Sequence, residues 1–150
     1  MNATILIETM VEDMLRLMGY APAVRAREVG SVLSVDVEVR EGAGALIGSG
    51  GEGIGALEEV VRRMTRTQLD ETTRVVLDVN GYRRERAVAL REEAREAAEK
   101  VKRSGEPYAF TPMSARERRV IHMELASRAD LITESNGEGP TRHVVIRAAA

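Results

Sequence analysis

A glycine-rich segment is the part of this sequence best suited to bind a ligand. Residues 48–55 include five glycines, and they lie between the apolar run 45–47 and a helix-like segment that begins near residue 56. Glycine tolerates positive φ and lets backbone N–H groups converge on an anion, and the N-terminus of a following helix adds a partial positive charge. The segment therefore predicts a phosphate site, and a flexible turn without a ligand is the alternative.

Two known motifs fit these glycines. Gly48-x-Gly50-x-x-Gly53 matches the dinucleotide fingerprint, with Asp78 in the place of the acidic ribose partner. Alternatively, residues 48–51 match the Gly-x-x-Gly loop of KH domains, which holds about four nucleotides by their backbone. The loop residues of this second motif are Gly48, Ser49, Gly50 and Gly51.

The order of the surrounding elements favours the KH motif. Hydrophobic periodicity predicts a helix over 2–18, a hairpin over 23–29 and 31–40, a short helix over 43–47, a helix over 51–67 and a strand over 74–79. A dinucleotide fold needs its glycines directly after a strand of a parallel sheet. Here a short helix precedes them, so the dinucleotide motif lacks its context.

The helix predicted after the glycines carries arginines on its outer side. Its apolar positions are expected to face a core: Ile54, Leu57, Val60, Val61 and Met64. Arg62 and Arg63, together with Arg66, are available to solvent. Either they form an ordinary solvated face, or they continue the phosphate site beyond the loop.

The C-terminal half predicts a second small domain. A long helix over 82–103 connects the halves, followed by a strand near 108–110, a helix over 114–127 and strands near 131–135 and 143–147. Ser114 and Glu117 form a capping box at the start of the second of these helices. We expect an α+β chain of two domains, 1–80 and 81–150, with helix 82–103 in the second.

Composition limits the classes of protein. The 150 residues carry 22 basic and 24 acidic side chains and no cysteine, which excludes disulfides and thiolate chemistry. Residues 1–60 hold four Arg against ten acids, whereas residues 61–150 hold 18 basic residues against 14 acids. No apolar run is long enough for a membrane helix. We expect a cytoplasmic protein without membrane insertion, whose basic C-terminal part is compatible with nucleic acid.

Four sequence blocks resemble one known family. They are Leu46-Ile47-Gly48-Ser49-Gly50-Gly51, the run Val75-Val76-Leu77-Asp78-Val79-Asn80-Gly81-Tyr82-Arg83, the segment from Pro112-Met113 through Glu117-Arg118-Arg119-Val120-Ile121-His122, and Gly139-Pro140-Thr141-Arg142-His143-Val144-Val145-Ile146. Together they are similar to the bacterial Jag proteins, also called SpoIIIJ-associated or KhpB proteins. The resemblance implies a type II KH domain, with the order helix-strand-strand-helix-helix-strand, followed by an R-three-H domain with a helix and a three-stranded sheet.

The resemblance also implies a nucleic-acid site in the second domain. Arg118 and His122, four positions apart on one helix, project from the same face. The family pattern assigns phosphate contact to Arg118, a nucleotide contact to His122, and a place nearby to Arg142; Arg119 belongs to the same block. The alternative is a plain helix face in which Arg118 pairs with Glu117 or Glu124.

The family implies post-transcriptional control linked to cell envelope growth or division, and a small KH-domain partner. We expect the chain itself to bind single-stranded RNA, with single-stranded DNA as the second candidate, and a homodimer is the alternative to the KH-domain partner. The sequence departs from the family in its loop, where Ser49 and Gly50 replace the usual basic residue and Glu52 follows. We expect this sequence to begin at the KH helix, so the membrane role of the extra N-terminal domain that the family often carries is not transferred.

No catalysis, cofactor or metal is expected, since only His122 and His143 supply imidazoles and neither lies in a catalytic pattern. Two alternatives remain: a dimerisation module with a degenerate KH loop, or a nucleotide-binding protein that uses Gly48 to Gly53.

Overall fold

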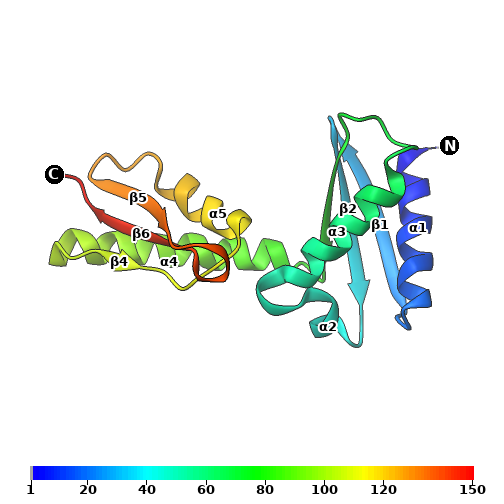
Figure 1. Cartoon of the computed structure of the whole chain (residues 1–150), viewed down its shortest axis with the longest axis horizontal. Helices are drawn as coiled ribbons and strands as arrows, with labels where there is room; N and C mark the ends of the chain where they lie inside the picture. The colour runs from blue at the N-terminus through cyan, green and yellow to red at the C-terminus, as the bar shows by residue number, and fades with distance from the viewer. Residues whose placement is uncertain (1) are drawn as a thin grey trace. The chain divides into compact units, whose positions relative to one another are not determined.

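The computed structural model describes residues 2–150, and the chain divides between Arg83 and Arg84 into two compact units (Figure 1). Each unit has its own hydrophobic core and its own three-stranded sheet. The predicted α+β class with two small domains is confirmed.

The first unit has the predicted element order. Its elements are α1 (Ala3–Leu17), β1 (Pro22–Val29), β2 (Val32–Val39), α2 (Ala43–Ile47), the 3-10 turn η1 (Ser49–Gly51), α3 (Glu52–Thr65) and β3 (Arg74–Val79). The sheet order is β1-β2-β3, with β1 antiparallel and β3 parallel to β2. A crossover between parallel strands needs a helix, and here α2 and α3 together provide it.

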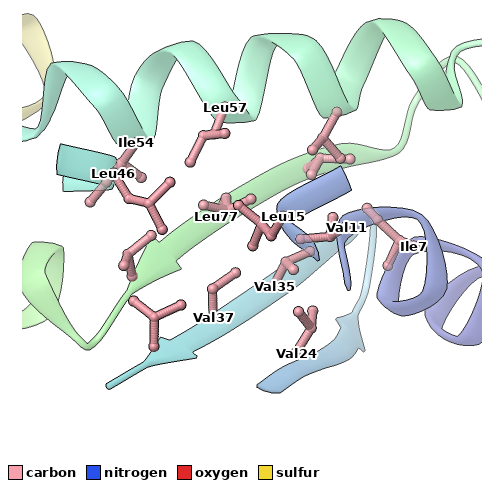
Figure 2. Close-up of a cluster of buried hydrophobic side chains, with 14 of the residues drawn as sticks. Ile7, Val11, Leu15, Val24, Val35, Val37, Leu46, Ile54, Leu57 and Leu77 are labelled. Carbon is pink, nitrogen blue, oxygen red and sulfur yellow. The ribbon is translucent and has the colours of Figure 1, made fainter. Parts of the chain in front are cut away.

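One face of this sheet is buried by the helices. The register sets Val35 opposite Leu77 and Val37 opposite Val79, and alternation turns these four side chains to the same side. Figure 2 shows Ile54 and Leu57 of α3 and Val11 and Leu15 of α1 pointing toward them. The other face of the sheet carries ion pairs such as Arg27 with Asp36, 2.9 Å apart.

Two of the predicted core positions on α3 are wrong. Val60 is 45% exposed and Met64 is 43% exposed. The buried stripe of α3 runs through Ile54, Leu57, Val61 and Thr65. Since successive residues differ by about 100° around a helix, Val60 and Met64 fall on the flank of that stripe.

Both edge strands of this sheet are bonded by a glutamate from a helix. Glu8 of α1 accepts a hydrogen bond from the backbone N–H of Ala26 on β1, at 2.7 Å. Glu58 of α3 accepts one from the N–H of Leu77 on β3, at 2.9 Å. Each carboxylate thereby satisfies an amide that has no neighbouring strand.

Asn80 turns the chain from β3 into the next helix. Its φ is +51°, a conformation that asparagine tolerates better than most residues. Its side-chain amide accepts from the N–H of Val39 at 2.9 Å and donates to the Val39 carbonyl at 3.0 Å. These two bonds extend the hydrogen-bond ladder at the end of β2. Asp78 then accepts from the N–H of Arg83 in the first turn of the helix, at 2.9 Å.

The second unit consists of two helices on one face of a sheet. Its elements are α4 (Tyr82–Ser104), β4 (Tyr108–Ala109), α5 (Ala115–Leu125), β5 (Leu131–Asn136), the 3-10 turn η2 (Gly139–Thr141) and β6 (His143–Ala148). The first two residues of α4, Tyr82 and Arg83, belong to the first unit, and the rest of the helix belongs to the second. The sheet order is β4-β6-β5, antiparallel throughout. The core contains Leu90 and Val101 of α4, Ile121 of α5, and Val144 and Ile146 of β6.

The predicted capping box at the start of α5 is confirmed. The Ser114 hydroxyl accepts from the N–H of Glu117 at 3.3 Å, and the Glu117 carboxylate accepts from the N–H of Ser114 at 3.4 Å. The box fixes where α5 begins, and therefore which of its side chains face the sheet.

Candidate nucleic-acid interface

The glycine loop joins α2 to α3 through a tight backbone contact. A side chain at Gly53 would overlap the carbonyl oxygen of Leu46, and a Cβ at Gly48 would lie 2.7 Å from the backbone nitrogen of Gly53. Gly48 also has a φ of +69°. These two glycines are therefore required by the packing of one helix end against the other, whether or not a ligand binds.

The middle of the loop is open to solvent. Ser49 and Gly50 are exposed, and a Cβ at Gly50 would meet nothing within 4 Å. Gly51, with φ +84°, rests on the ring of Tyr82, whose Cε1 would be 3.2 Å from its Cβ. No basic side chain belongs to the loop, so any phosphate contact here falls to the backbone N–H groups.

The arginines of α3 lie away from the loop and are paired. Arg62 donates to Glu59 from both Nε and Nη2, and Arg63 Nε lies 2.6 Å from the other oxygen of Glu59. Hydrogen bonds from Arg62 and then Arg63 hold the pKa of Glu59 below its usual value. Arg62 stands ten positions after Glu52, about 15 Å along the axis. The structure therefore does not bring Arg62 and Arg63 together with Gly48 to Gly51.

A dinucleotide site needs a strand directly before its glycines and an acidic side chain for the ribose. The glycine loop of this chain has neither. The glycines follow α2, which is a helix, and the carboxylate of Asp78 is 8% exposed and bonds the N–H groups of Val79 and Arg83. Asp78 therefore serves the junction of β3 and α4.

In the second unit, the Arg118 side chain and the Arg142 backbone both bond the backbone of Met113. Arg118 Nε donates to the carbonyl of Met113 at 3.3 Å, and the N–H of Met113 donates to the carbonyl of Arg142 at 3.2 Å. The Arg142 side chain donates to the carbonyl of Gly137 at 2.8 Å. The Arg118 side chain and the Arg142 backbone thus bond the same residue, whereas the Arg142 guanidinium bonds Gly137, and a shared site of the two arginines stays a prediction.

His122 lies between α5 and β5. Its Nδ1 is 2.9 Å from the hydroxyl of Thr133, and its Nε2 is 3.0 Å from the hydroxyl of Ser135. Partial burial, and then the charge of Arg118, lower the pKa of His122 below its ordinary value. Both effects favour the neutral ring, which has a hydroxyl beside each nitrogen.

The carboxylates of α5 are bound by arginines of α4. Arg86 pairs with Glu117 at 3.0 Å, and Arg95 pairs with Glu124 at 2.6 Å. Arg118 therefore does not pair with Glu117 or Glu124, as the alternative interpretation required. Within residues 2–150, Arg118 and Arg119 take part in no ion pair, and Arg119 is exposed.

Thr133 and Ser135 were missed by sequence reasoning. The sequence alone indicates that Thr133 and Ser135 share a face with Leu131, because alternate residues of a strand point to the same side. Leu131 is buried. No local sequence pattern indicates that this face of β5 contacts His122, because Thr133 and Ser135 lie 11 and 13 positions after His122.

Residues 2–150 contain no cluster of His, Asp or Glu side chains arranged to hold a metal ion. Over the same residues, every helix is too short or too polar to cross a bilayer.

Residues 88–148 match the family model of the R-three-H domain. The second unit, with its helix that carries Arg118 and His122, is therefore an R-three-H domain. Over about 70% of its length the chain is similar to proteins named RNA-binding protein KhpB, so the resemblance predicted from the sequence is confirmed. It is 37% identical over 103 residues to the protein of Clostridium symbiosum (69% of this chain and 46% of that protein). It is 37% identical over 103 residues to that of Lactiplantibacillus plantarum (69% and 32%), and 32% identical over 108 residues to that of Bacillus subtilis (71% and 52%).

The chain thus spans about half, or less, of the length of these curated relatives. Neither the first unit's assignment as a KH domain nor the ten predicted site residues is tested by these comparisons, and both stay predictions.

Proposed function

We propose that this chain binds single-stranded RNA, and that its principal contact is the α5 face of the R-three-H domain. The observation that carries the proposal is the pair Arg118 and Arg119. Both stand on a helix whose own carboxylates are bound elsewhere, and the backbone of Arg142 lies near Arg118, since both bond Met113. Guanidinium groups without a carboxylate partner are suited to bind phosphate, which they grip by two parallel hydrogen bonds. The relatives' printed name, RNA-binding protein, supports RNA as the ligand.

The first unit is proposed to act as a KH domain that holds the RNA backbone at Gly48, Ser49, Gly50 and Gly51. Two observations support this role. The loop follows a short helix and precedes a longer one, as the predicted order requires, and its middle residues are open to solvent. Contact through backbone N–H groups carries no charge of its own, so we expect it to add less affinity than the α5 face.

The proposed activity is binding without catalysis, in the cytoplasm, where RNA is made. Its cellular role is proposed to be post-transcriptional control linked to cell envelope growth or division. Single-stranded DNA is a second ligand of the same chemistry, and a small KH-domain protein or a second copy of this chain is the proposed protein partner.

The test compares two double variants that remove equal charge. Fluorescence anisotropy of a labelled, mixed-sequence single-stranded RNA is measured at several salt concentrations with wild type, Arg118→Ala/Arg119→Ala and Arg62→Ala/Arg63→Ala. The α5 variant is expected to bind about tenfold more weakly or worse, and its log-log salt slope is expected to shrink by about 1.4, since each phosphate contact on a single strand contributes about 0.7. The α3 variant is expected to stay within about twofold of wild type, because its arginines are paired with Glu59.

Equal losses in both variants would mean that affinity follows net charge alone, and the assigned face would be wrong. If wild type binds no RNA at low salt, the RNA proposal is wrong for this chain. Light scattering that then showed a tight dimer would favour a protein-interaction module.

A further inference from the structure

Two hydroxyl groups stand side by side on β5, next to the arginines of α5. Thr133 and Ser135 lie on the same face of the strand, about 7 Å apart along it, and both are half-buried. His122 reaches between them from α5 and bonds one hydroxyl with each ring nitrogen, at 2.9 and 3.0 Å. Arg118 lies one helical turn before His122, on the same side of α5.

The histidine gives the two hydroxyls opposite roles. A neutral imidazole has one N–H donor and one bare nitrogen that accepts. The hydroxyl that accepts from the ring N–H keeps its own hydrogen to donate to a ligand. The other hydroxyl donates its hydrogen to the bare nitrogen and presents only lone pairs. Either tautomer of His122 produces this result, so the pair always offers one donor and one acceptor.

A ribonucleotide matches this pair. It carries a 2′-hydroxyl, which can donate to the acceptor, beside a phosphate, whose oxygens accept from the donor. A deoxyribonucleotide keeps the phosphate and lacks the 2′-hydroxyl, which is the group that lets a protein distinguish RNA from DNA. We propose that Thr133, Ser135 and His122 read the ribose 2′-hydroxyl, so that the R-three-H domain of this chain prefers RNA to DNA of the same base sequence.

This inference rests on the proposed function, because Arg118 must bring a phosphate to the same face. A purely structural role for the hydroxyls is the competing explanation, since their bonds to His122 also fasten α5 to β5. The two explanations differ in their readout. A structural role lowers stability when the hydroxyls are removed and leaves the ratio of RNA to DNA affinity unchanged, whereas a recognition role changes that ratio.

The first experiment changes only the ligand, so folding is not at issue. Wild-type protein is titrated against labelled RNA, DNA and 2′-fluoro RNA of one base sequence. The fluorine substitution keeps an RNA-like sugar shape and removes the hydrogen that the 2′-hydroxyl donates. We expect RNA to bind about two- to tenfold more tightly than either analogue, the effect of one hydrogen bond. Equal affinity for RNA and 2′-fluoro RNA would overturn the proposal, because any preference over DNA would then come from sugar shape.

The second experiment changes the protein. The Thr133→Val/Ser135→Ala variant is expected to bind RNA and DNA with nearly equal affinity. Ser127→Ala is the matched control, since Ser127 is an exposed serine of the same unit and should keep the wild-type ratio. Thermal unfolding of each variant verifies that it is folded.

The outcomes separate this inference from the proposed function. If Arg118→Ala/Arg119→Ala weakens RNA binding while the hydroxyl variant keeps the wild-type ratio, the face binds nucleic acid and the hydroxyl inference is wrong. If the arginine variant binds RNA as tightly as wild type does, the proposed face itself is wrong.

Discussion

Helices α3 and α5 both expose arginines, but their carboxylates are arranged in opposite ways. On α3, Glu59 pairs with both Arg62 and Arg63 of its own helix. On α5, by contrast, the glutamates turn to the arginines of α4, and Arg118 and Arg119 keep no carboxylate partner among residues 2–150. We therefore expect phosphate binding by these helices to depend on the placement of the nearest acids more than on the number of arginines.

The glycine loop extends the comparison to the backbone. In the first unit the proposed phosphate contact has no side-chain charge, and some of its glycines serve helix packing. In the second unit the proposed contact lies on side chains of α5, a helix that a capping box starts and whose His122 bonds a pair of hydroxyls. Substitutions in both units test this division.

Gly53→Ala is expected to destabilise the protein by about 2 kcal/mol or more, because the added methyl would overlap the Leu46 carbonyl and force α2 and α3 apart. Gly55→Ala, in the same helix, is the control: its Cβ would be 3.9 Å from Arg83 Nη2, and it should stabilise by about 0.5 to 1 kcal/mol through higher helix propensity. Urea denaturation followed by circular dichroism measures both. Equal effects of the two substitutions would show that the contact between α2 and α3 is not tight.

Gly50→Asp is expected to weaken RNA binding about fivefold, because it sets a negative charge where the loop meets solvent. Gly50→Asn is the matched variant, since both residues tolerate the left-handed conformation that φ +58° imposes and a Cβ there meets nothing within 4 Å. Asparagine should leave the affinity nearly unchanged. If both variants bind RNA like wild type, the loop makes no contact with RNA.

Glu59→Gln is expected to raise RNA affinity about twofold at low salt, because it releases Arg62 and Arg63 from their shared carboxylate. Glu71→Gln removes the same charge from an exposed position of the first unit without releasing an arginine, so it serves as the control. A similar gain from both substitutions would attribute the effect to net charge and would remove the contrast between α3 and α5.

The smallest effect is a pH dependence of stability at His122. Its pKa in the folded protein lies below its ordinary value of about 6.5, through burial and then through Arg118, while β5 presents only hydroxyls to it. The unfolded chain therefore binds the proton more readily. The stabilising contribution is complete above about pH 6.5 and is lost as the pH falls below that value.

Comparison of wild type with His122→Gln, by urea denaturation near pH 7.5 and near pH 5.5, measures this dependence. The free energy of unfolding of wild type should fall more over this interval. A glutamine variant with the same decline would assign the dependence to other groups.

The sequence predicted the elements well because their signals are local. The periodicity of α1, the alternation of β2 and the capping box at Ser114 each extend over a few neighbouring residues, and all three are present. The exposure of Val60 and Met64 depends on how α3 is rotated against the sheet, which periodicity fixes only approximately.

The candidate site was predictable only in part, since its decisive contacts are distant in sequence. The family pattern identified Arg118 and His122, and the structure adds their surroundings. Glu117 and Glu124 bond arginines 31 and 29 positions away, and the hydroxyl partners of His122 come from a strand that starts after α5 ends. No local pattern encodes such pairings.

The glutamates at the edges of the first sheet have a consequence for self-association. An unpaired edge strand is a template for a strand of another molecule, and it leads to fibre growth if it is left open. In this chain a carboxylate already occupies an amide of each edge, at Ala26 and at Leu77. An incoming strand would have to displace Glu8 or Glu58 from that amide and cover its charge, which is costly. Edge-to-edge pairing of this sheet is therefore disfavoured at these two amides.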